Sequence, residues 1–127
     1  MKGITELDTI PFLAKLNEIR KVAADCIGET EVLEIRKRMP IVNGNESPEQ
    51  LEKMRIEQGK KNVNAILDSL LEKHPEATIK LLECMIVYDE GEQHLTGIKL
   101  VSRALREIMD DAVIDFLLSA AKLGINV

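Results

Sequence analysis

The residues with the most reactive side chains are two cysteines and two histidines, and their spacing decides which chemistry the chain can carry. Cys26 and Cys84 lie far apart and match neither a zinc-binding nor a redox spacing, so we expect reduced thiols in the core. His74 precedes a proline at a helix junction, where a capping or surface role explains it. Neither histidine has a partner at catalytic or metal-ligand spacing. These patterns predict no catalysis, no bound metal and no cofactor.

The second histidine, His94, belongs to the acidic stretch DEGEQHLTG. With Asp89, Glu90 and Glu92 it could loosely hold a cation. The carboxylates do not follow the ordered spacing of an EF-hand loop, and the stretch lacks the lysine and hydroxyl residue of a phosphate loop. A solvated loop is the favoured interpretation. A small enzyme or metal protein that uses His94, Cys84 and the nearby carboxylates stays open as an alternative.

Two charged clusters have an ordinary structural explanation. Asp110 and Asp111 suit the start of a helix, so we expect one of them to cap it rather than to perform acid–base chemistry. The basic run at 36 to 38 suits the end of a surface helix, where cations interact favourably with the helix dipole. Residues 75 to 127 carry nine acidic and five basic side chains, which accounts for −4 of the net charge of −5. Nucleic acid is therefore not expected as a partner, because phosphate binding needs clustered cations.

Composition and patterning give the class of fold. The chain has 127 residues and only 2% aromatic residues, so its core must be built from aliphatic side chains. Such residues mixed with glutamate and lysine favour helices, and no alternating strand pattern is present. The first residues do not form a signal-peptide pattern, and no apolar run approaches the ~18 residues of a membrane span. We therefore expect a cytoplasmic protein without a membrane partner.

Steps of three and four between apolar residues predict a helix near the start of the chain and a shorter one after it. The first begins near Asp8 or Thr9, either of which can cap it, and stops near Gly28. The second covers 30 to 39, is more charged, and ends at the following proline. A link near 40 to 47 follows, and its turn-forming residues predict that it is flexible.

The second half of the chain adds three or four helices. The stretch SPEQ at 47 to 50 is a capping box with proline at the first helical position, so it begins a long helix. Pro75 starts the next helix, which is expected to be buried and to end near Gly91. A further helix starts near Thr96, and its apolar face is formed by Ile98, Val101, Leu105 and Ile108. The sum is an all-α fold: a single domain over residues 1 to 127, built as one compact bundle of five to six short helices.

The last helix, within DDAVIDFLLSAAKLGINV at 110 to 127, has apolar residues around too much of its circumference for a single contact. Phe116 and Leu118, for example, lie roughly 200° apart on a helical wheel. One side, around Ile114 and Leu117, is expected to seal the core against a buried helix at 76 to 88. The other side is expected to bind a partner or a second copy. Its residues are Phe116, Leu123, Ile125 and Val127.

Two stretches carry a resemblance to a known family. NVNAILDSLLEKHPEATIKLLECMIVYDE and LVSRALREIMDDAVIDFLLSAAKLG resemble the tail assembly chaperones of long-tailed bacteriophages and prophages. The resemblance covers about residues 60 to 124 and lies in the series of helices and caps. It implies a non-enzymatic role in the bacterial host cytoplasm: binding the tape measure protein, keeping it soluble, and helping the tail tube protein assemble around it. The family has no catalytic residues to carry over.

A second class of function stays open beside the chaperone. The chain is also typical of a generic helical adaptor or scaffold, phage or bacterial, that forms homo-oligomers through the same C-terminal surface. Gene context separates the two classes, because a neighbouring tape measure gene favours the chaperone. Assembly into a closed ring without a partner favours the scaffold.

Overall fold

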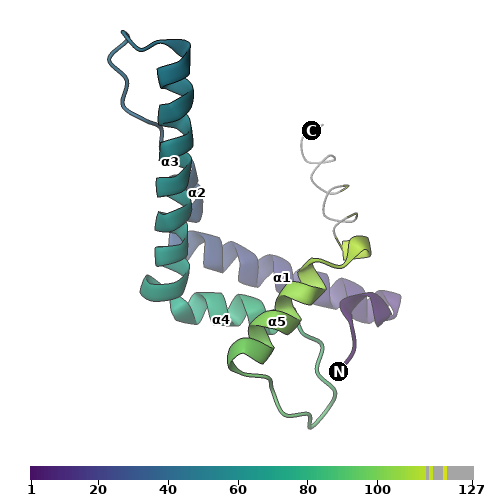
Figure 1. The fold of residues 1–127 in the computed structure, drawn as a ribbon. Helices are drawn as coiled ribbons and strands as arrows, with labels where there is room; N and C mark the ends of the chain where they lie inside the picture. Colours follow the sequence, from purple (N-terminus) through teal and green to yellow (C-terminus); the bar gives the residue numbers. More distant parts are fainter. Residues whose placement is uncertain (114, 116–118, 120–127) are drawn as a thin grey trace. The chain divides into compact units, whose positions relative to one another are not determined.

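A computed structural model describes residues 1–113, 115 and 119, which form helices joined by turns and links (Figure 1). No β-strand occurs in this part of the chain, where Lys2 and Val87 form an isolated antiparallel bridge. The all-α prediction is confirmed. In chain order the elements are the 3-10 helix η1 (Ile4–Glu6), α1 (Thr9–Thr30), α2 (Val32–Arg36), α3 (Pro48–Asp68), the π-helical turn η2 (Ser69–Lys73), α4 (Pro75–Cys84) and α5 (Gly97–Ile108).

The chain divides into two compact units, and the first of them is discontinuous in sequence. Unit 1 comprises Met1–Ala23 and Ile79–Val127, and unit 2 comprises Ala24–Thr78. Helices α1 and α4 each begin in one unit and end in the other. That the two units form a single compact domain stays a prediction.

The core of unit 1 lies where the start of the chain meets α5 and the segment after α4. Ile4, Met85 and Ala104 are buried against one another. The side chain of Glu107 is also buried. It accepts a hydrogen bond of 3.0 Å from the Ile4 amide and forms an ion pair of 2.9 Å with Arg103. A buried carboxylate thus ties the first residues of the chain to α5.

Unit 2 has a smaller and more polar core. Its buried residues are three apolar ones, Cys26, Ile35 and Ala77, and two hydroxyl residues, Thr30 and Ser69. The Ser69 hydroxyl donates to the Thr30 carbonyl at 2.7 Å, and the Thr30 hydroxyl donates to the Cys26 carbonyl at 2.7 Å. These bonds satisfy polar groups that would otherwise be costly to bury. None of the 21 residues of α3 is buried.

The predicted helix starts are confirmed. At α3, the Gln50 amide donates to the Ser47 hydroxyl at 3.2 Å, and the Ser47 amide donates to the Gln50 side chain at 2.8 Å. Thr96 is the residue before α5. The Asp110 carboxylate accepts from the amides of Ala112 and Val113, so Asp110 caps the helical turn at 111 to 113. Residues 38 to 47, between α2 and α3, are not helical and loop out beside the start of α3 (Figure 1).

The α3 capping box supports a first prediction. Replacing Ser47 with alanine will lower the free energy of unfolding by about 1 kcal/mol, because the Gln50 amide loses its acceptor. Urea melts followed by circular dichroism will measure the loss. Ser47→Asp is the matched control and will keep most of the stability, because aspartate also caps helices. Equal stability of Ser47→Ala and the native protein would show that the box contributes nothing.

Two predicted helix ends near the start of the chain are wrong. Gly28 does not stop α1, which continues to Thr30, where the buried side chain bonds back to the preceding turn. The chain then turns at Glu31, whose φ of 55° is left-handed and interrupts the helix. The following helix, α2, has five residues rather than the ten predicted over 30 to 39.

The predicted end of the buried helix near Gly91 is also wrong. Helix α4 ends at Cys84, where the Met85 and Ile86 amides bond to carbonyls three residues back and tighten the last turn. The chain then extends, and Val87 pairs with Lys2. Met85 and Ile86 are buried, but in a non-helical segment. The predicted helix at 76 to 88 is therefore shorter, since a contact with the distant start of the chain ends it.

Candidate interaction surfaces

The C-terminal surface predicted from the sequence falls in the part of the chain that the structure does not describe. Phe116, Leu123, Ile125 and Val127 lie outside the described residues, as do Ile114 and Leu117 of the predicted core side. The described part of that helix is its cap at Asp110, the helical turn at 111 to 113, and residues 115 and 119. The partner-binding role of these residues stays a prediction.

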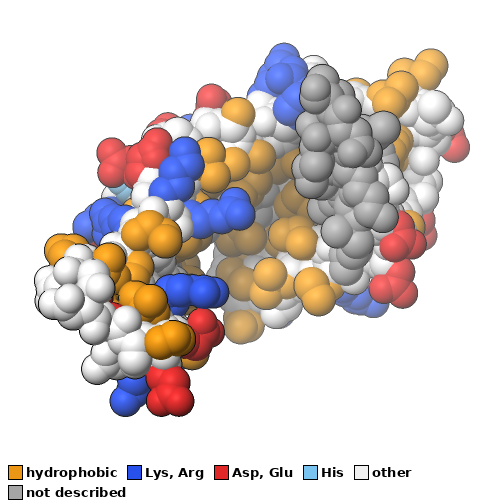
Figure 2. Space-filling model, turned by 90° about the horizontal axis from the view of Figure 1, so that it is seen from above, with side chains coloured by type: hydrophobic (Ala, Val, Ile, Leu, Met, Phe, Trp, Pro, Cys, Tyr) orange, Lys and Arg blue, Asp and Glu red, His pale blue; other side chains and the backbone are white. Residues whose placement is uncertain are grey.

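The described residues present apolar surface on two other helices. Figure 2 shows apolar side chains spread over much of the face that it presents. Among the described residues, large apolar side chains that are exposed outnumber the buried apolar ones. Single exposed apolar residues are normal, so only stripes on one side of a helix indicate a binding surface. Such stripes occur on α3 and α5.

The α3 stripe consists of apolar residues spaced by seven and four positions, a spacing that places them on one side of the helix. Each of them is between 46% and 66% exposed. A hollow of about 530 Å³ lies beside Gly59, which has no atom within 4 Å of the position of a Cβ. The missing side chain of Gly59 leaves the helix surface recessed at this notch. The stripe consists of Ile56, Val63, Leu67 and, in η2, Leu71.

The opposite side of α3 explains why the stripe is left uncovered. Gln58 donates to Asn62 at 2.8 Å, and Asn62 donates to the Arg38 carbonyl at 3.1 Å. Both side chains are half-buried. The helix therefore contacts the rest of unit 2 partly through amides, and the residues of the α3 stripe lie on its other side. The spacing of Val63 and Leu67 in the sequence places them on one side of a helix, but it does not show which side of that helix contacts the rest of unit 2.

The α5 stripe is the apolar face predicted from the sequence, and most of it is exposed. Ile98, Val101 and Leu105 are 79%, 38% and 50% exposed, and only Ile108 of the predicted set packs against the core. The helix is held instead by Leu100, Ala104 and Glu107, which are buried. Glu107 is buried although it is charged, because its carboxylate bonds to Ile4 and Arg103 inside unit 1.

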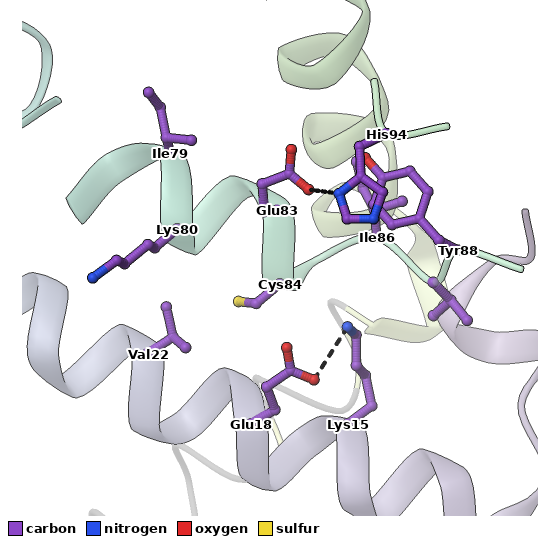
Figure 3. A pocket seen from close by; sticks show the side chains of 11 residues that line it. Lys15, Glu18, Val22, Ile79, Lys80, Glu83, Cys84, Ile86, Tyr88 and His94 are labelled. Atoms are coloured by element: carbon purple, nitrogen blue, oxygen red, sulfur yellow. Dashed lines mark hydrogen bonds and ion pairs between the residues drawn. The ribbon is translucent and has the colours of Figure 1, made fainter. Parts of the chain in front are cut away.

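His94 and Cys84 of the alternative enzyme or metal site line one hollow of about 550 Å³ in unit 1, whereas Asp89, Glu90 and Glu92 do not line it (Figure 3). His94 stacks on Tyr88 with ring centroids 3.9 Å apart, and its Nδ1 lies 3.3 Å from Glu83 Oε2. The Cys84 thiol donates to the Leu81 carbonyl, and Figure 3 shows it turned towards α1 rather than towards His94. Within the described residues, no three metal-ligating side chains come together. The contacts of His94 with Tyr88 and Glu83 hold the loop after α4 against α4.

Burial and ion pairing shift the pKa of several titratable groups in the two units. Burial raises the pKa of the Tyr88 hydroxyl, which accepts a hydrogen bond from the Leu95 amide. Burial also raises the pKa of the Cys26 thiol, which keeps it protonated and unreactive. The Met1 ammonium pairs with Asp89 and Glu92. A hydrogen bond from this ammonium lowers the pKa of Asp89, so the acidic loop already has a cation.

No protein-family model, curated protein or solved structure matches this chain. None of the helices in the described part of the chain has both the length and the apolarity needed to cross a bilayer. The candidate interaction surfaces among the described residues are therefore two apolar stripes, one in each unit. The loop after α4 is held in place by its own contacts.

Proposed function

We propose that this protein is a tail assembly chaperone of a long-tailed phage or prophage, acting in the bacterial cytoplasm. It binds helices of the tape measure protein, keeps them soluble, and assists assembly of the tail tube protein around them. The observation that supports this function is α3, a helix of 21 residues with no buried residue and a one-sided apolar stripe. The resemblance of residues 60 to 124 supplies the identity of the partner.

Removal of apolar side chains from water provides the driving force for this binding. Burying a valine or leucine side chain is worth about 1.5–3 kcal/mol relative to leaving it exposed, so a stripe of four such residues favours association. A long apolar-faced helix laid along the stripe would bury it in the manner of helix-in-groove recognition. The notch at Gly59 would admit a larger side chain and set the register. These interactions need no catalytic residue, so the proposed role is non-enzymatic.

The α3 stripe also supports a second candidate function, a helical scaffold that forms homo-oligomers. The same apolar residues would then meet those of another copy. A stripe that is covered by self-association in the purified protein favours the scaffold. A purified protein that stays monomeric and binds a tape measure helix through this stripe favours the chaperone.

A binding experiment tests the chaperone. We expect the native protein to co-purify with a fragment of the tape measure protein encoded beside it. A Val63→Glu, Leu67→Glu double variant will weaken this binding at least tenfold, because each lost apolar contact is worth more than the ~1.4 kcal/mol of a tenfold change. Isothermal titration calorimetry on the purified fragment will measure the affinity.

Lys61→Glu is the matched control. It lies on the same helix, is exposed, and changes the net charge by the same two units as the double variant. We expect it to bind like the native protein. Failure of the native protein to bind the fragment overturns the chaperone. Sedimentation that shows an oligomer broken by the double variant would instead support the scaffold.

A further inference from the structure

We infer that α5 is a separate docking surface, and that its occupant is an acidic amphipathic helix of another protein. This surface lies in unit 1 and does not depend on the α3 stripe or on a tape measure partner. The inference rests on the arrangement of buried, exposed apolar and basic residues around α5.

Helix α5 has three distinct sides. The first is buried and holds the helix through Leu100 and Ala104. The second is the exposed stripe of Ile98, Val101 and Leu105, spaced by three and four residues as in helices that pair with another helix. Met109, directly after α5, extends the stripe and is 67% exposed. A stripe with this spacing fits one partner helix along its length.

The third side is basic and borders the stripe. Lys99 and Arg106 are exposed and seven residues apart, so they lie on the same side of the helix. Arg103 is different, because it pairs with the buried Glu107 at 2.9 Å. Within the described residues, Lys99 and Arg106 form no ion pair. Two exposed cations thus flank an apolar stripe in a chain whose net charge is −5.

This charge arrangement selects the occupant. Residues that flank an apolar seam set the choice of partner through their charges. An acidic helix would place carboxylates opposite Lys99 and Arg106 while its apolar residues cover the stripe. The surroundings of the stripe therefore match an amphipathic helix with glutamate or aspartate along one border.

A second copy of α5 is a poorer match for the same surface. In an antiparallel pair the two Lys99–Arg106 rows would face each other, and like charges oppose such pairing. In a parallel pair each row would face the opposite edge of the stripe, where Val101 adjoins the buried side of the helix, and that edge has no countercharge. Self-pairing through α5 is thus disfavoured in both orientations.

Two synthetic peptides test the inference. Both are helices of about 20 residues with leucine at the seam positions; one has glutamate and the other lysine at the flanking positions. We expect fluorescence anisotropy to show that the native protein binds the acidic peptide roughly tenfold more tightly, given two attractive contacts in one case and two repulsive contacts in the other. Raising the salt concentration will reduce this preference.

Charge reversal makes the test specific to α5. The Lys99→Glu, Arg106→Glu double variant will reverse the preference and bind the basic peptide more tightly. The Lys60→Glu, Lys61→Glu double variant, with the same charge change on α3, will keep the native preference. Leu105→Asn will weaken binding of both peptides. Circular dichroism will verify that each variant is folded.

Three results would overturn the inference. The first is equal affinity of the native protein for both peptides, and the second is an unchanged preference after charge reversal on α5. The third is self-association of the native protein that Leu105→Asn abolishes, because a second copy would then occupy the stripe. The α3 variants tested with the tape measure fragment are separate, so this inference and the proposed chaperone fail independently.

Discussion

Replacing Ala104 with aspartate will unfold unit 1, whereas replacing its neighbour Leu105 with aspartate will leave it folded. Ala104 is 0% exposed and packs with Ile4 and Met85, so a carboxylate there would lose its water without gaining a partner. Such a buried charge costs several kcal/mol, a large share of the 5–15 kcal/mol that stabilises a typical domain. Leu105 is half exposed, and its carboxylate would stay in water.

The pair is a matched experiment on one helix. Both substitutions add one negative charge at adjacent positions of α5, so they differ chiefly in burial. Thermal melts followed by circular dichroism will show a lost or strongly lowered transition for Ala104→Asp and a nearly native one for Leu105→Asp. If Leu105→Asp unfolds the protein as severely, then the α5 stripe is covered and the inferred docking surface is wrong.

Replacing Glu107 with alanine will lower the free energy of unfolding by about 3 kcal/mol. The change removes the acceptor of the Ile4 amide and the partner of Arg103. Arg103 cannot readily compensate, because its Nε is already buried and has no hydrogen-bond partner among the described residues. Removing one member of a buried ion pair typically costs 3–5 kcal/mol. We expect the low end of about 3 kcal/mol, since part of the Arg103 side chain still reaches water.

A double substitution separates the ion pair from the fold. Glu107→Leu combined with Arg103→Met replaces the pair with apolar side chains of similar size and should recover part of the lost stability, as it leaves no charge unpaired although the Ile4 amide still lacks its acceptor. Glu107→Gln should be intermediate, because an amide oxygen still accepts from Ile4. Denaturant melts of the three variants and the native protein will provide the free energies. A native-like Glu107→Ala would mean that this carboxylate does not stabilise unit 1.

The sequence predicted the helix starts well because the signals are local. Ser47 and Asp110 bond to amides within three residues, so the residues that decide each start are adjacent in the chain. The end of α4 is different. It depends on Val87 pairing with Lys2, a residue from the other end of unit 1. No window of sequence around Gly91 contains that information.

The candidate surfaces were only partly predictable for a related reason. Periodicity correctly grouped Ile98, Val101 and Leu105 on one side of a helix, but period alone does not say which side faces the core. The side of α5 that faces the core contains a small residue, Ala104, and a charged one, Glu107. Glu107 is buried because it bonds to Ile4 and Arg103. A single glutamate in a sequence is normally predicted to be exposed, since charged residues are rarely buried unless paired.

The hydrogen bond between Ile4 and Glu107 joins residues 103 positions apart, so the ribosome makes Ile4 long before it makes Glu107. The first 23 residues belong to a unit whose other part begins only at Ile79. At ordinary elongation rates, roughly 5 to 20 s pass between translation of Ile4 and translation of Glu107. By the end of this interval all of unit 2 has been made, whereas Ile4 and Phe12 have waited for the rest of their core. The nascent chain therefore presents the α3 stripe before unit 1 can close.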